Sequence, residues 1–179
     1  MTWTTHSTRD VYTNPWIRVR EDAVTRPDGS PGIYGVVDVA PAVFVVAVDD
    51  EDSVVLVELE RYTTGVLSLE VPAGGSDGEE LLVAAQRELL EETGLLAGSW
   101  SPLGAVWALN GVARAREHVF LARELTLGGP AVGAAEEGIR GTRRVPLAEA
   151  LRLVREGGIT DASTVTALTF AALELGRFP

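Results

Sequence analysis

Three glutamates at helical spacing are the residues of this sequence that could do chemistry. Glu88 and Glu92 stand four positions apart and Glu91 lies between them, so their carboxylates project from one side of a helix. Like charges at this spacing repel each other and weaken an isolated helix. A hard divalent cation such as Mg²⁺, which takes carboxylate oxygens as ligands, would relieve that repulsion. A solvated acidic helix face is the alternative, and the spacing by itself leaves both open.

A helix that follows a turn must position these glutamates. An apolar segment ends at Pro72, and a glycine-rich stretch follows before apolar residues recur at helical spacing. Ser76 and Glu79 stand in the spacing of a capping box, which predicts the start of the helix. Gly94 stands where a left-handed C-terminal cap is expected. The pattern therefore predicts a helix over about 79–93.

The order of residues from Glu79 to Leu95 resembles the Nudix box, whose signature is G-x5-E-x7-R-E-U-x-E-E-x-G-U, with U an aliphatic residue. Every position from Glu79 onward matches. The first glycine departs, because Gly74 lies one position too close to Glu79 and Ala73 stands at the expected place. We interpret this departure as a turn shortened by one residue.

The resemblance implies a site for a divalent cation, Mg²⁺ or alternatively Mn²⁺. It implies that Glu88 and Glu92 are direct ligands and that Glu91 is a ligand directly or through water. The carbonyl of Ala73 is implied as a further ligand.

Further catalytic roles follow from the same resemblance. Arg87 is implied to orient the carboxylates, and Glu79 to brace the loop through Arg87. In the family, a glutamate from a mobile loop near the end of the sheet is the general base, and Glu136 and Glu137 occupy the corresponding region. An ordinary solvated acidic loop is the alternative for either residue.

Composition limits the class of protein. With 179 residues, of which 46% are hydrophobic, the chain is long enough for one domain with a substantial core. The net charge of −11 argues against nucleic acid as a partner, because no long-range attraction to phosphate exists. The lack of cysteine excludes disulfides, a thiol nucleophile and a cysteine-based zinc site. Since no signal-peptide pattern and no membrane-spanning apolar run is present, we expect a cytoplasmic protein without a membrane partner.

Apolar patterning outside the helix predicts a mixed α/β fold. Residues 1–40 predict strands and turns, with a hairpin over about 16–38. Two β-branched runs, 42–48 and 54–59, predict buried central strands. Further predicted elements are strands at 67–71, 103–109, 118–122 and 143–145, a loop over 124–139, and helices over about 147–155 and 161–175.

Segments outside the box resemble the ADP-ribose and related ADP-sugar pyrophosphatases. The segments that carry this resemblance are 14–16, 27–29, 60–62, 69–74, 117–123 and 158–164. It implies a single domain over 1–179, an α/β/α sandwich of Nudix type with a mixed β-sheet. About 1–40 would form an N-terminal β-hairpin extension, and about 41–179 the catalytic fold. It also implies a homodimer formed through the N-terminal strands.

The implied activity is metal-dependent hydrolysis of the diphosphate of a nucleoside diphosphate sugar, with ADP-ribose giving AMP and ribose 5-phosphate. Trp16 is the preferred base-stacking residue, because the N-terminal hairpin contributes to nucleotide binding in the family; a structural tryptophan is the alternative. Arg61, which lies between a strand and the box, is a candidate contact to a phosphate or ribose of the substrate, and Glu117 is a further candidate substrate contact. A salt bridge to Glu60 or Glu70 is the alternative for Arg61.

Two other functions stay open. One is hydrolysis of another nucleoside diphosphate derivative or nucleotide, since Asn110 and Gly111 stand where ADP-ribose enzymes often carry a proline. The other is a non-catalytic nucleotide-binding regulator of Nudix fold. Such proteins often lose box carboxylates, whereas this sequence keeps all of them.

Overall fold

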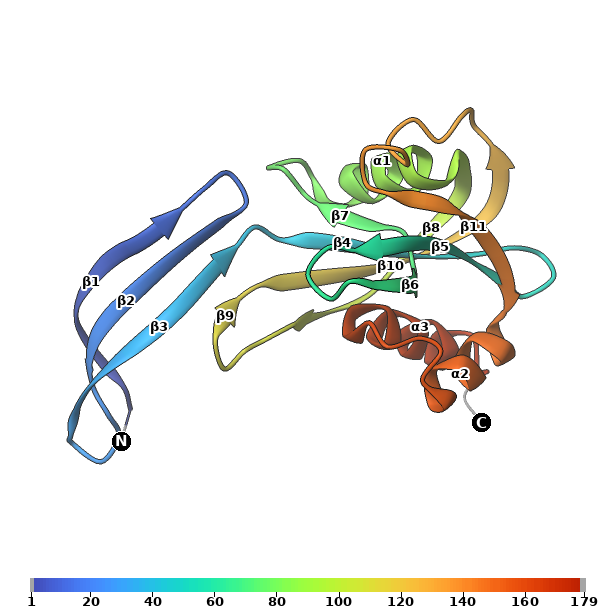
Figure 1. Cartoon of the computed structure of the whole chain (residues 1–179). Coiled ribbons are helices and arrows are strands. Elements are labelled where there is room, and N and C mark those ends of the chain that lie inside the picture. The colour runs from blue at the N-terminus through green and yellow to red at the C-terminus, as the bar shows by residue number, and fades with distance from the viewer. Residues whose placement is uncertain (1, 178–179) are drawn as a thin grey trace. The chain divides into compact units, whose positions relative to one another are not determined.

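Two compact units make up the chain in the computed structural model, which describes residues 2–177 (Figure 1). The first unit contains the chain up to Pro41 together with 107–116. The second unit contains 42–106 and the chain from Glu117 onward. The segment 107–116 therefore folds with strands that are far from it in the sequence.

The first unit is a four-stranded sheet. Its strands are β1 (Thr4–Thr13), β2 (Ile17–Thr25), β3 (Pro31–Val39) and β9 (Ala113–Arg114), in the order β1-β2-β3-β9. The first three strands pair antiparallel, and β9 pairs in parallel with β3. Arg26 closes the turn between β2 and β3, since its amide donates to the Ser30 carbonyl at 2.8 Å. The hairpin predicted over about 16–38 is confirmed as β2 and β3.

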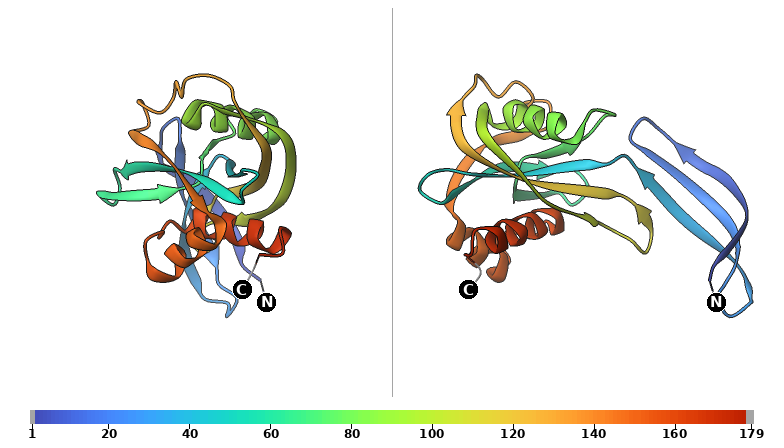
Figure 2. Two further views of the ribbon diagram at one scale, coloured as in Figure 1. Left: turned by 90° about the vertical axis from the view of Figure 1, so that its right-hand side faces the viewer. Right: turned by 180° about the vertical axis from the view of Figure 1, so that it is seen from behind.

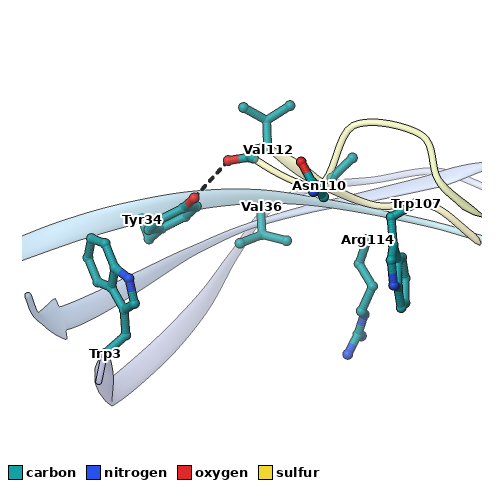
Figure 3. Close-up of a pocket in the computed structure, with 9 residues that line it drawn as sticks. Trp3, Tyr34, Val36, Trp107, Asn110, Val112 and Arg114 are labelled. Carbon is teal, nitrogen blue, oxygen red and sulfur yellow. Dashed lines mark hydrogen bonds between the residues drawn. The ribbon is translucent and has the colours of Figure 1, made fainter. Parts of the chain in front are cut away.

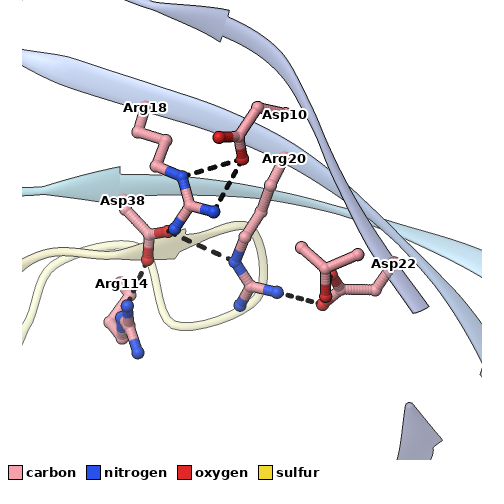
Figure 4. A network of polar contacts seen from close by, with 7 residues as sticks. Asp10, Arg18, Arg20, Asp22, Asp38 and Arg114 are labelled. Carbon is pink, nitrogen blue, oxygen red and sulfur yellow. Dashed lines mark hydrogen bonds and ion pairs between the residues drawn. The ribbon is translucent and has the colours of Figure 1, made fainter. Parts of the chain in front are cut away.

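A charge network holds β9 against this sheet (Figure 4). Asp38 on β3 lies 2.8 Å from Arg114 Nε on β9 and 3.2 Å from Arg20 Nε on β2. Arg20 also pairs with Asp22, and Arg18 Nη1 lies 3.6 Å from Asp38. Because the Asp38 side chain is only 15% exposed, solvent screens its ion pairs less than it would at the open surface.

The second unit is built on a mixed sheet. Its strands are β4 (Ala42–Val48), β5 (Ser53–Arg61), β6 (Val66–Glu70), β7 (Ala73–Gly75), β8 (Leu95–Trp107), β10 (Arg116–Leu127) and β11 (Ile139–Pro146). The main order is β11-β5-β4-β10-β8, with β6 beside β5 and β7 beside β4. β10 runs parallel to β4, whereas β5 runs antiparallel to both β4 and β11.

Within the described part of the chain, three helices cover the two faces of this sheet. They are α1 (Leu81–Thr93), α2 (Leu147–Glu156) and α3 (Ala162–Glu174), close to the predicted spans. Figures 1 and 2 show α1 on one face and both α2 and α3 on the other. The predicted α/β/α sandwich is therefore confirmed. Within residues 2–177, no helix is both long and apolar enough to cross a lipid bilayer.

Strand alternation in β4 divides the core into two layers. Val45 faces the side of α1 and packs in one cluster with Leu89, whereas Val46 packs on the other side with Leu168 of α3. All four side chains are fully buried. Because successive strand residues point to opposite faces, a continuous apolar run is what a strand covered on both faces needs.

The capping box predicted at the start of α1 is wrong. The cap is Glu80, whose Oε2 accepts from the amides of Leu82 at 2.9 Å and Val83 at 3.2 Å. The carboxylate of Glu79 instead accepts from Arg87 Nε at 2.9 Å. An ion pair with a residue two turns along the helix replaces the local capping bond. The left-handed cap predicted at Gly94 is confirmed, with φ 72°.

Several strands are longer than predicted. β8 begins at Leu95, directly after α1, although the prediction began at 103. β10 continues to Leu127 and β11 begins at Ile139, so the loop predicted over 124–139 is limited to 128–138. These extensions are rich in exposed positions and in residues with low strand propensity. These parts of β8, β10 and β11 become strands because they pair with a neighbouring strand, and local composition does not indicate that pairing.

Candidate functional site

Three carboxylates converge where α1 meets the loop before β11. Glu88 and Glu92 come from α1 and Glu137 from the loop, and one oxygen of each lies within 4.8 Å of the others. Glu88 and Glu92 are each only 3% exposed, whereas Glu137 is exposed. The structure thus joins two buried helix residues to one residue that solvent reaches.

Glu88, Glu92 and Glu137 form what we call the carboxylate group. Burial and mutual repulsion make the free energy of its fully ionised state unfavourable. Burial raises the pKa of Glu92 far above its usual range, and the hydrogen bond and charge of Glu137 raise it further. The Ala73 amide acts in the opposite direction by donating to Glu92 Oε2 at 3.1 Å. Burial also raises the pKa of Glu88. A divalent cation would offset both the burial and the repulsion.

The surroundings of Glu88 fit such a cation. Its Oε1 accepts from Arg87 Nη1 at 2.7 Å, while its buried Oε2 has no hydrogen-bond partner within the described chain. Gly74 lies against this carboxylate so closely that a Cβ there would be 2.1 Å from Oε1. The unpartnered oxygen, the two neighbouring carboxylates and the hard oxygen donors are the features of a Mg²⁺ or Mn²⁺ site.

Gly74 also clarifies the shortened turn. It makes the close approach to Glu88 that only a residue without a side chain permits, although the spacing to Glu79 is one residue short. Between Gly74 and α1 the backbone is left-handed at Asp77, with φ 48°, and at Gly78, with φ 83°. α1 starts at Leu81, and the Glu88 side chain on this helix lies against Gly74.

Arg87 holds the carboxylates and the turn together. Its guanidinium donates to Glu79 Oε2 at 2.9 Å, Glu91 Oε2 at 3.1 Å and the Gly75 carbonyl at 2.9 Å, in addition to Glu88. The orienting role predicted for Arg87 agrees with these contacts. The Glu91 carboxylate pairs with this arginine. Among residues 2–177, Glu91 is not a member of the carboxylate group.

The structure separates the two candidate bases. Glu137 belongs to the carboxylate group, whereas Glu136 is not among its members in the described chain. The loop that carries Glu137 is anchored to α1, because the Gly133 amide donates to the Glu91 carbonyl at 3.0 Å. The sequence predicted Glu136 and Glu137 together, because adjacency in a loop does not indicate which side chain lies near Glu88 and Glu92.

A cavity of about 450 Å³ adjoins this unit's sheet where β5 and β6 meet the start of α3. Arg61 lines it and donates through Nε to Glu70 Oε1 at 3.0 Å, so the salt bridge that was the alternative to a substrate contact is present. The pKa of Arg61 is raised by Glu70 first and by Asp161 and Glu92 to a smaller extent. The guanidinium is therefore within electrostatic range of the carboxylate group, and its side chain is 47% exposed and open to a ligand.

A hydrogen bond connects Glu117 to a serine that lines the same cavity. Ser163, which lines the cavity, donates to Glu117 Oε1 at 2.9 Å, and burial raises the pKa of Glu117. Of the two predicted substrate contacts, Arg61 therefore lines the cavity, and Glu117 is bonded to Ser163, which lines it. The sequence separates them by more than fifty positions, and a sheet and a helix bring them together.

The first unit has an aromatic cavity of its own, also of about 450 Å³ (Figure 3). Trp3, Tyr34, Trp107 and Arg114 are among its lining residues, and Trp3 meets Tyr34 edge to face with ring centroids 5.2 Å apart. Trp16, the predicted base-stacking residue, is not one of them and is 76% exposed in the turn between β1 and β2. The sequence gives no signal for this cavity, because its aromatic residues are far apart along the chain.

Comparisons with known proteins agree with this geometry. Residues 3–37 match the family described as nucleoside diphosphate sugar hydrolase N-terminal domain, and residues 38–167 match the NUDIX domain. A methanol dehydrogenase activator of Bacillus methanolicus is 30% identical over 95% of this chain and 92% of its own length. An ADP-ribose pyrophosphatase of Bacillus subtilis (strain 168) is 32% identical over 92% of this chain and 89% of its own length. The crystal structure of an ADP compounds hydrolase has the same fold, with a TM-score of 0.86 at 22% identity, covering 99% of this chain and 98% of that chain.

The contact of Gly74 with Glu88 predicts a selective loss of cation binding. In Gly74→Ala, the new Cβ displaces the Glu88 carboxylate, whose flexible end can move without unfolding the chain. We expect the affinity for Mn²⁺, measured by isothermal titration calorimetry, to fall roughly 10- to 100-fold. Gly75→Ala is the matched control, since the nearest atom to its Cβ is Asp77 Oδ1 at 3.2 Å on an exposed side chain. Equal affinities in the two variants would contradict the role of Gly74.

Proposed function

Because the chain belongs to the NUDIX family, we propose that it hydrolyses the diphosphate of a nucleoside diphosphate sugar, with ADP-ribose as its substrate. The enzyme is a pyrophosphohydrolase. The observation that carries the proposal is the carboxylate group of Glu88, Glu92 and Glu137, with an unpartnered buried oxygen on Glu88. The match of residues 3–37 to a nucleoside diphosphate sugar hydrolase domain supports the substrate class.

NUDIX hydrolases require divalent metal ions, and we propose Mg²⁺ for this chain. Glu88 and Glu92 would hold it, with the Ala73 carbonyl and with Glu91 directly or through water. When bound, the cation supplies charge neutralisation of the diphosphate and of the oxyanion that develops during the reaction. Arg87 keeps the Glu88 and Glu91 carboxylates in place through its hydrogen bonds.

The proposed reaction adds one water molecule to the diphosphate. The water oxygen bonds to one phosphorus as the bond from that phosphorus to the bridging oxygen breaks, which gives AMP and ribose 5-phosphate. Glu137 accepts the proton of the attacking water, because it is the exposed member of the carboxylate group and is carried by a loop. Arg61 and Glu117 would contact the substrate from the cavity beside α3.

A non-catalytic regulator is the second candidate function. The identity of 30% to a protein named methanol dehydrogenase activator supports a regulatory role. The intact carboxylates favour hydrolysis, since a binding module has no need for a buried, mutually repelling group. Turnover by the purified chain distinguishes the two.

The proposal is tested with a panel of ADP-ribose, other nucleoside diphosphate sugars, deoxynucleoside triphosphates and coenzyme A. With Mg²⁺ present, we expect the highest kcat/KM on ADP-ribose, measured as products separated by ion-exchange chromatography. Excess chelator should abolish turnover, and Glu92→Gln should lower it roughly 10²-fold or more while the chain stays folded. A higher kcat/KM on the triphosphates or on coenzyme A would overturn the assigned substrate, and undiminished turnover with chelator would overturn the metal mechanism.

The position of Glu137 predicts a difference between two neighbouring residues. We expect Glu137→Gln to lower kcat roughly 10²- to 10⁴-fold, as for loss of a general base. Glu136→Gln removes the same charge one position earlier and should change kcat less than about threefold, since Glu136 is outside the carboxylate group. Steady-state kinetics at saturating Mg²⁺ provide the comparison. The reverse order of effects would assign the base to Glu136.

We also propose a homodimer formed through the first unit. β1 is exposed along its full length, and Val11, Tyr12 and Ile33 are each more than half exposed. A second copy of the chain would cover this apolar surface and bring Trp16 to the partner's substrate.

Trp16→Ala is expected to raise KM for ADP-ribose roughly tenfold with little change in kcat, because base stacking contributes about 1–3 kcal/mol to binding. Light scattering at micromolar concentration should give the mass of a dimer for both the wild type and this variant. A fully active monomer, or an unchanged KM, would count against this arrangement.

A further inference from the structure

A single hydroxyl from α3 reaches the segment that leads into the carboxylate site. Thr164 lies in the first turn of α3 and is fully buried, and its Oγ1 accepts a hydrogen bond from the Val71 amide at 3.2 Å. β6 ends at Glu70 and β7 begins at Ala73, so Val71 lies between the two strands. A buried amide needs an acceptor, and here the acceptor is a side chain 93 positions further along the chain.

The residues after Val71 connect this hydrogen bond to a carboxylate. Pro72 has no N–H, and its carbonyl accepts from the Val45 amide at 2.8 Å. The next amide, that of Ala73, donates to Glu92 Oε2 at 3.1 Å. Val71 is therefore held two residues before the donor that orients Glu92.

α3 does not need the Thr164 hydroxyl for its own stability. Asp161 caps the helix, since its Oδ2 accepts from the Thr164 amide at 2.7 Å. The hydroxyls of Thr166 and Thr169 donate to carbonyls one turn back in the same helix, at 2.9 and 2.8 Å. The Thr164 hydroxyl instead bonds to a different element. Its distinct partner indicates a task outside the helix.

We infer that Thr164 is a positioning residue of the carboxylate site, which acts by holding Val71 and, through the rigid Pro72, the Ala73 amide on Glu92. The inference rests on the proposed metal-dependent hydrolysis. When the hydroxyl is removed, the Ala73 amide moves away from Glu92 and the carboxylate loses its fixed orientation. Cation affinity and kcat then fall, while the contacts that bind the rest of the substrate stay.

Thr164→Val tests this directly, because valine keeps the branched shape and removes the acceptor. We expect the dissociation constant for Mn²⁺, measured by electron paramagnetic resonance of the free ion, to rise about tenfold. For ADP-ribose hydrolysis, kcat should fall about tenfold, and KM should stay within about twofold. Amide exchange at Val71, measured by NMR, should become faster than in the wild type.

Two matched variants separate positioning from general stability. Thr164→Ser keeps the hydroxyl and should restore Mn²⁺ affinity and kcat to near the wild-type values. Thr169→Val removes a hydroxyl whose bond stays within α3, and should leave both quantities unchanged. Thermal denaturation of each variant checks that the chain is folded.

The contrary results are equally clear. Wild-type Mn²⁺ affinity and kcat in Thr164→Val would overturn the inference, as would an equal loss in Thr169→Val. If the valine variant does not fold, Thr164→Ala, which also removes the acceptor, is measured in the same way. Fast exchange of the Val71 amide in the wild type would overturn the inference without any variant. A wild-type chain that neither binds Mn²⁺ nor hydrolyses ADP-ribose would overturn the proposed function itself.

Discussion

The burial of Glu88 and Glu92 next to each other is the constraint on which the rest of the second unit depends. Two carboxylates that are 3% exposed lose most of their hydration, and the nearby Glu137 adds repulsion. Arg87 offsets part of this cost because one guanidinium contacts three carboxylates and the Gly75 carbonyl. These groups act as one electrostatic unit, in which the turn and the helix hold each other in place.

Much of the second unit could be predicted from the sequence, because the relevant signals are local. A run of β-branched residues is sufficient to indicate β4 and β5, and a glycine after an apolar helical repeat indicates the end of α1 at Gly94. The position of Glu88 relative to Glu92 follows from helix geometry. The cap of α1 differs from the prediction because Glu79 forms an ion pair with Arg87, which competes with the local capping bond.

The remaining features depend on contacts between distant parts of the chain. Val71 and Thr164 are 93 positions apart, and no pattern around either residue indicates that they meet. The choice between Glu136 and Glu137 depends on how a loop lies over α1, which composition does not determine. The same is true of the aromatic cavity, where Trp3 and Trp107 come together through the pairing of β3 with β9.

The anchor between Gly133 and Glu91 has a consequence for how the loop can move. The amide of Gly133 bonds to the carbonyl of Glu91, so the loop that carries Glu137 is attached to α1 through backbone atoms. Because the attachment uses backbone atoms alone, a side-chain substitution elsewhere in the loop leaves it in place. Movement of the loop away from α1 breaks this bond and carries Glu137 away from Glu88 and Glu92.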